Sequence, residues 1–148
     1  MSEPTEADIA RALRLLEPPP KSKVLCSNDL YEQVAPFLLG HEVERLVIVY
    51  FDRLFGVLGT ETLSIGGAAH TVVDVPFVLR SAIRSGCVGF AIAHNHASSR
   101  DPEPSPGDLE MTIRVAAAAQ AVGLTLVDHI VVGGPNSYVS IKERGGVP

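Results

Sequence analysis

Cysteine is scarce in this sequence: its 148 residues include only Cys26 and Cys87. The two lie far apart in the chain and form no C-x-x-C pair. Nothing in this arrangement requires a disulfide bond, so we expect a protein of a reducing compartment.

Leader and membrane-spanning patterns are also missing. The N-terminal segment, MSEPTEADIA, is acidic, whereas a signal peptide begins with a basic and then an apolar stretch. Apolar runs such as Leu46–Phe51 are far shorter than the roughly 20 residues that a transmembrane helix needs. These features predict a cytoplasmic protein without a membrane partner.

Positive charge is in short supply as well, with 12 Lys and Arg against 17 Asp and Glu and a net charge of -5. This balance argues against a protein that grips phosphate backbones over its whole surface, so a nucleic-acid partner is not favoured. The remaining composition, 46% hydrophobic and 20% charged, is typical of a globular chain. Its length predicts one compact domain with a sizeable core.

The first 40 residues are expected to form a short helical extension. Apolar residues at helical spacing predict a helix over Glu6–Glu17, which Pro18–Pro20 would end as a stiff connector. Ser27 or Asn28 is expected to cap a second helix that ends near Gly40. We therefore place a helical N-terminal extension with a proline-rich connector at 1–40.

Residues 41–148 show the pattern of an α/β domain. Continuous or β-branched apolar runs predict five strands, at Leu46–Phe51, Leu54–Leu63, Val88–Ala93, Leu124–Val132 and Ser137–Ile141. Helical spacing, with a glycine after each segment, predicts two helices, at Val75–Ser85 and Asp108–Val122. This order predicts a single mixed-sheet domain flanked by helices.

The stretch AHNHASSRDPEPSPGD contains the residues most typical of a chemical site. His94 and His96 directly follow a predicted strand, and residues two apart point to the same face. Asp108 lies at the start of the next predicted helix. Two imidazoles and one carboxylate are a donor set that suits zinc, and three protein ligands plus a water are typical of catalytic zinc sites. The spacing alone leaves an alternative open: the two histidines could be polar loop residues that bind no metal, and Asp108 could serve only as a helix cap.

Several segments resemble one known family. His94-Asn95-His96, followed by a D-P-x-P-S-x-x-D segment that ends at Asp108, resembles the metal motif of RadC-type proteins of the JAB1/MPN/JAMM class. Three further segments resemble the family's strands in the same order: Glu44–Asp52, Gly59-Thr60 and Leu126–Val131. The resemblance implies the JAB1/MPN fold, which is cytidine-deaminase-like, across most of 41–148.

The resemblance also implies site residues and an activity. His94, His96 and Asp108 would be the zinc ligands, and Ser105 would help to stabilise an oxyanion. Glu44 would act on a zinc-activated water, with Glu42 as a close competitor. Together they would form a JAMM-type metallopeptidase that cleaves an amide or isopeptide bond in a peptide or protein substrate.

Other features leave alternatives open. The loop after His96 has Ala97 where the family has proline and is one residue longer, so it must bulge to deliver Asp108. Asp128-His129 could orient a metal ligand or make only structural hydrogen bonds.

A RadC-like binding module, associated with DNA repair or DNA metabolism without turnover, is the alternative function. A hydrolase needs Glu44 and an activated water, and a binding module does not. The sequence does not indicate an oligomeric state.

Overall fold

A computed structural model describes residues 3–16, 22–66 and 74–147 of the chain. In this part of the chain four helices and five strands follow one another: α1 (Glu6–Leu16), α2 (Ser27–Leu38), β1 (Arg45–Phe51), β2 (Val57–Ile65), α3 (Val75–Ser85), β3 (Gly89–Asn95), α4 (Pro106–Ala121), β4 (Thr125–Gly134) and β5 (Ser137–Ser140). The order of strands and helices from β1 to β5 confirms the predicted mixed α/β domain. The proposed connector Pro18–Pro20 lies outside the described residues.

The strands form one sheet in the order β2-β1-β3-β4-β5. Only β3 and β4 are parallel, and the other neighbours pair antiparallel. In the β1–β3 pairing, Leu46 lies opposite His94. The amino end of β1 and the carboxyl ends of β3 and β4 therefore meet at the same edge of the sheet.

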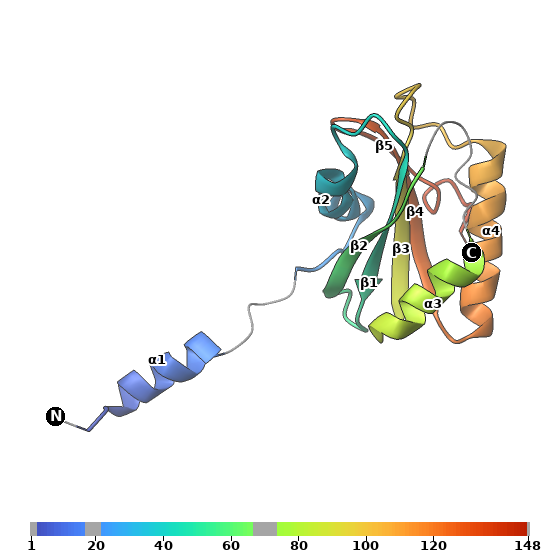
Figure 1. Ribbon diagram of the computed structural model, residues 1–148. Helices are drawn as coiled ribbons and strands as arrows, with labels where there is room; N and C mark the ends of the chain where they lie inside the picture. Colours follow the sequence, from blue (N-terminus) through green and yellow to red (C-terminus); the bar gives the residue numbers. More distant parts are fainter. Residues whose placement is uncertain (1–2, 17–21, 67–73, 148) are drawn as a thin grey trace.

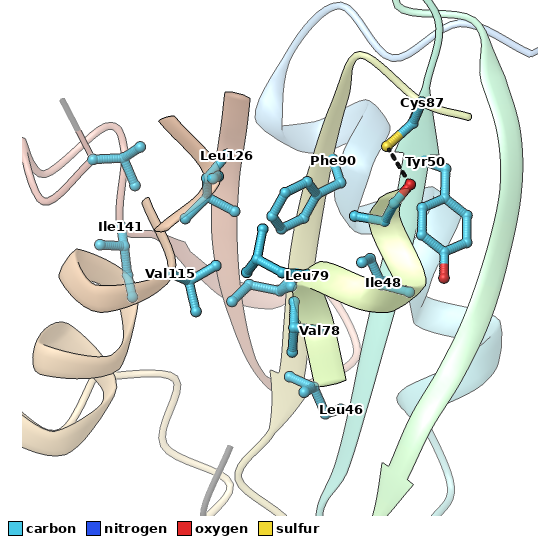
Figure 2. Packing of buried hydrophobic residues seen from close by; sticks show 14 of the residues in the cluster. Leu46, Ile48, Tyr50, Val78, Leu79, Cys87, Phe90, Val115, Leu126 and Ile141 are labelled. Atoms are coloured by element: carbon cyan, nitrogen blue, oxygen red, sulfur yellow. Dashed lines mark hydrogen bonds between the residues drawn. The ribbon is translucent and has the colours of Figure 1, made fainter. Parts of the chain in front are cut away.

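Helices cover both faces of this sheet, as Figure 1 shows, with α2 on one side and α3 and α4 on the other. Because side chains alternate along each strand, β1 and β3 contribute buried residues to both layers. Figure 2 shows the layer under α3 and α4, where Ile48, Phe90 and Leu79 pack together. In the same layer the buried Cys87 thiol donates to the Ala82 carbonyl, 3.3 Å away.

The two N-terminal helices differ in their packing. On α2, Leu30, Val34 and Leu38 are almost fully buried against the sheet. On α1, by contrast, Leu13 and Leu15 are 59% and 79% exposed. In the described part of the chain, no helix is both long enough and apolar enough to cross a lipid bilayer.

The second strand begins later than the sequence predicts, at Val57 and not at Leu54. The Asp52 carboxylate accepts the amide protons of Leu54, at 2.9 Å, and Gly56, at 2.8 Å. Phe55 adopts a positive φ of 59° within the same turn. Aspartate often bonds backbone amides two residues ahead, and this local hydrogen bonding extends the turn at the expense of the strand.

Candidate metal centre

Strand β3 places the two histidines. All its residues from Gly89 to Asn95 are buried, and His94 shares the face of Ile92, under α3 and α4. His96 lies just beyond the strand, but its amide donates to Val132 O at 2.9 Å. The β3–β4 pairing thus continues by one hydrogen bond and holds the backbone of His96 in place.

The first turn of α4 places Asp108. Ser105 is the N-cap residue: its hydroxyl accepts the amide proton of Asp108 at 3.1 Å. In return, the Asp108 carboxylate accepts the Ser105 amide proton at 2.8 Å, which completes a capping box. The predicted start at Asp108 is therefore two residues late, and the cap is Ser105. Pro106 fits the first helical turn because it lacks the N–H that would have no partner there.

The three predicted ligands come together. The Nε2 atoms of His94 and His96 are 3.2 Å apart. The Asp108 carboxylate oxygens lie 3.2 Å from His94 Nε2 and 3.1 Å from His96 Nε2. Ligand atoms about 2.05 Å from a tetrahedral zinc would be separated by about 3.3 Å. The group can hold a metal ion, and its spacing is close to the edges of such a tetrahedron.

The loop between His96 and Asp108 turns back tightly. The Arg100 amide donates to His96 O at 2.9 Å, and Arg100 itself has a φ of 54°. A positive φ is costly for a residue with a side chain, so the surrounding contacts must hold this turn. The turn accommodates the long loop and still brings Asp108 to both histidines.

The tautomer of the neutral His96 ring follows from the hydrogen bond at Nδ1, the ring nitrogen that faces away from Asp108. His96 Nδ1 lies 2.7 Å from the carbonyl oxygen of Asp101, which can only accept a hydrogen bond. Nδ1 therefore carries the proton of the neutral ring. This leaves the lone pair of Nε2 directed at the candidate metal position, as a metal ligand requires.

The electrostatics of the centre favour an ionised Asp108 carboxylate. Burial acts to raise the pKa of the Asp108 carboxyl, but the His94 imidazole and the bonds from Ser105 hold that pKa well below its usual range. His129 is fully buried behind His94, and burial lowers its pKa well below the ordinary value. At neutral pH Asp108 is thus available as a ligand, and His129 is uncharged.

Asp128 and His129, which the sequence leaves with two roles, differ in what they contact. The Asp128 carboxylate accepts from the Ser140 hydroxyl at 2.6 Å and from the Lys142 amide at 3.1 Å, so it ties β5 and the C-terminal segment to β4. His129 contacts a candidate ligand: its Nε2 lies 2.8 Å from His94 Nδ1.

Asn95, between the two histidines, is a residue that the sequence reasoning missed. Its side chain accepts from the Arg45 amide at 2.7 Å and donates to Val43 O at 3.2 Å. It therefore ties the segment that carries Glu44 to the carboxyl end of β3. The sequence feature that could have identified Asn95 is its position at the end of a predicted buried strand, because a buried side-chain amide needs hydrogen-bond partners.

The two candidate glutamates both precede β1 in the chain. Glu44 directly precedes β1, in which Leu46 lies opposite His94. Among the described residues, its carboxylate makes no hydrogen bond or ion pair, and its carbonyl accepts from Gly66 N. Glu42 lines a pocket of about 400 Å³ together with His96 and Arg100. The two remain alternatives for the base.

Comparison with known proteins identifies the family of this chain. A family model described as the RadC-like JAB domain matches residues 24–146 of the chain. The chain belongs to the RadC-like JAB domain family. This confirms the resemblance predicted from the sequence, and the match includes α2 together with the sheet.

Several curated relatives are similar over almost the whole chain. A UPF0758 protein of Carboxydothermus hydrogenoformans is 34% identical over 138 residues, which are 93% of this chain and 60% of that protein. The UPF0758 protein lmo1549 of Listeria monocytogenes is 33% identical over 93% of this chain and 61% of its own length. A UPF0758 protein of Methanococcoides burtonii is 30% identical over 93% of this chain and 59% of its length. This RadC-like chain thus spans about 60% of the length of these relatives.

Proposed function

We propose that this RadC-like JAB domain is a zinc-dependent hydrolase of the JAMM type that cleaves an amide or isopeptide bond in a peptide or protein substrate. The observation that carries the proposal is the convergence of His94, His96 and Asp108 at spacings of 3.1 to 3.2 Å. Two nitrogen donors and one carboxylate suit zinc better than magnesium or calcium. Three protein ligands leave the fourth position of a tetrahedral ion open, as in catalytic zinc sites.

In this proposal the chain's own groups bind, orient and move a proton. When bound, the zinc ion would lower the pKa of a water molecule towards about 7 and polarise the substrate carbonyl. Glu44 would accept a proton from the attacking water and pass it to the leaving amine as the C–N bond breaks. Glu44 directly precedes β1, whose residue Leu46 lies opposite His94, and this placement supports the role.

Ser105 can take part without giving up its structural role. Its hydroxyl oxygen accepts from the Asp108 amide, which leaves the hydroxyl proton free to donate. That proton would stabilise the negative charge that develops on the carbonyl oxygen. The pocket beside His96 offers room for a substrate residue next to the scissile bond.

The first test is metal content in protein purified without added metal or a histidine tag. We expect about one zinc per chain in the parent and none in Asp108→Ala. Asp101→Ala is the matched control: it removes a carboxylate from the same loop but keeps the carbonyl that anchors His96. A parent that binds no zinc even when zinc is supplied would contradict the proposal and favour the binding-module alternative.

The zinc-loaded parent is then assayed on a panel of peptides and isopeptide-linked conjugates. Loss of general base catalysis in Glu44→Gln should reduce turnover by about 10²- to 10⁴-fold while zinc stays bound. Glu42→Gln, two residues away, is the control and should keep its turnover. The reverse result would identify Glu42 as the base, and absence of turnover on every substrate would contradict the hydrolase assignment.

A further inference from the structure

A chain of hydrogen bonds runs behind the metal centre from α4 to His94. Thr112 Oγ1 lies 2.7 Å from the Asp108 carbonyl oxygen and 2.6 Å from His129 Nδ1. His129 Nε2 lies 2.8 Å from His94 Nδ1. Thr112 and His129 are both fully buried, so bulk water offers neither of them another partner.

The donor and acceptor in each of these hydrogen bonds follow from the bond between Thr112 and the Asp108 carbonyl. The Asp108 carbonyl can only accept, so the single proton of the Thr112 hydroxyl is used in that bond. Towards His129 the hydroxyl must then accept, which places the proton of the neutral His129 ring on Nδ1. His129 Nε2 is left as an acceptor, so the His94 Nδ1 atom opposite it must be the donor.

We infer that Thr112 and His129 are positioning residues that hold His94 in its Nδ1–H tautomer and so keep His94 Nε2 free to bind a metal ion. The backbone carbonyl of Asp101 does the same for His96 through one direct bond. For His94 the tautomer is set through two side chains, Thr112 and His129. These hydrogen bonds begin at the backbone carbonyl of Asp108, which is itself a candidate ligand. The start of α4 therefore supplies a carboxylate to the centre and also sets the tautomer of a second ligand.

The opposite arrangement would block the site. If Thr112 donated to His129, the His129 Nε2 proton would point at His94 Nδ1 and the His94 proton would move to Nε2. That proton would face the Asp108 carboxylate, 3.2 Å away, where a metal ion is expected. The hydroxyl of Thr112 would then lie 2.7 Å from the Asp108 carbonyl with no proton between the two oxygens, which disfavours this arrangement.

The functional meaning of this tautomer rests on the proposed metal site, but the tautomer itself can be measured without a metal. Long-range ¹H–¹⁵N spectra of the metal-free protein report which nitrogen of each histidine ring carries the proton. We expect His94 to be protonated on Nδ1 in the parent and in Thr112→Ser, which keeps the hydroxyl. Thr112→Val has nearly the same shape but no hydroxyl, and we expect the His94 proton to shift towards Nε2 in it.

Zinc titration provides a second readout. Loss of an outer hydrogen-bond partner commonly weakens metal binding by about 10- to 100-fold, and we expect this loss in Thr112→Val, with recovery in Thr112→Ser. Val115→Ala, also buried on α4, is the control for a general loss of packing and should keep the parent's His94 tautomer.

The two kinds of failure can be told apart. A metal-free parent with His94 protonated on Nε2, or a folded Thr112→Val with an unchanged tautomer and unchanged zinc affinity, would overturn the inference even if zinc binds. If Thr112→Val does not fold, a His94 proton on Nε2 in the parent or in Thr112→Ser still overturns the inference. A parent with the expected tautomer that binds no zinc would contradict the proposed function and leave the inference standing.

Discussion

Gly133 shows how a single residue without a side chain supports the candidate metal centre. A Cβ atom at this position would lie 2.4 Å from Arg100 O and 2.8 Å from the Pro102 ring. The loop that carries the His96 anchor therefore packs directly on the backbone of β4. The left-handed conformation of Arg100 is part of the same close contact, because this turn brings its carbonyl to Gly133.

We predict that Gly133→Ala displaces this loop. Overpacking of this kind typically costs about 1 to 3 kcal/mol, and the shift would also move the Asp101 carbonyl away from His96. Chemical denaturation should show the loss of stability, and zinc titration should show weaker binding. Gly134→Ala is the matched control, since a Cβ at Gly134 meets nothing within 4 Å. Equal stability and zinc affinity in the two variants would contradict the prediction.

At the scale of elements, the beginning of α4 combines a helix cap with a binding group. The Asp108 carboxylate takes part in the capping box and faces both histidines. Thr112, Val115 and Ala119 continue the same inward face along the helix. Because one face of α4 both packs on the sheet and carries Asp108, the helix cannot rotate or slide without moving Asp108 away from the two histidines.

We predict that Ser105→Ala weakens the cap of α4 but leaves the Asp108 carboxylate in place as a metal ligand. Loss of the hydroxyl removes an acceptor from the Asp108 amide and should lower the free energy of unfolding by about 1 kcal/mol. The Ser105 amide still donates to the Asp108 carboxylate, so the variant should keep its zinc. Urea unfolding and metal analysis test both points, with the exposed Ser98→Ala on the same loop as control. Loss of zinc in Ser105→Ala alone would show that the backbone bond cannot hold Asp108 without the cap.

At the scale of the whole molecule, both faces of the sheet depend on a helical layer. The face opposite the metal centre is covered by α2, which precedes the predicted boundary at residue 40. Leu30, Val34 and Leu38 are each at most 2% exposed. Burial of such side chains contributes about 1.5 to 3 kcal/mol each, and the sum is comparable to the total stability of many domains.

We predict different results for two truncations. A chain that begins at Ser22 keeps the bond from Val57 N to Ser22 O and should melt at the parent temperature. A chain that begins at His41 lacks α2 and should be unfolded or insoluble. Thermal unfolding by circular dichroism compares the two. A folded chain from His41 with an unchanged melting temperature would support the boundary at residue 40, and a large loss from Ser22 onwards would show that α1 contributes to stability.

The sequence by itself determined the parts of this protein that depend on local order along the chain. Apolar runs and helical spacing predicted all five strands, and helix α3 was predicted with its observed ends. The H-x-H spacing and the next helix start pointed to His94, His96 and Asp108. These features are local because alternation and helical periodicity act over a few residues.

Only the tertiary structure decided how the chain's distant parts meet. Thr112 and His129 are 17 residues apart and Asn95 and Arg45 are 50 apart, so no local pattern predicts their hydrogen bonds. Sheet register sets Leu46 opposite His94, and burial then leaves each polar group with the partners that the fold provides. The tautomer that we infer for His94 is therefore a property of the packed molecule, because it is set by partners that only folding brings together.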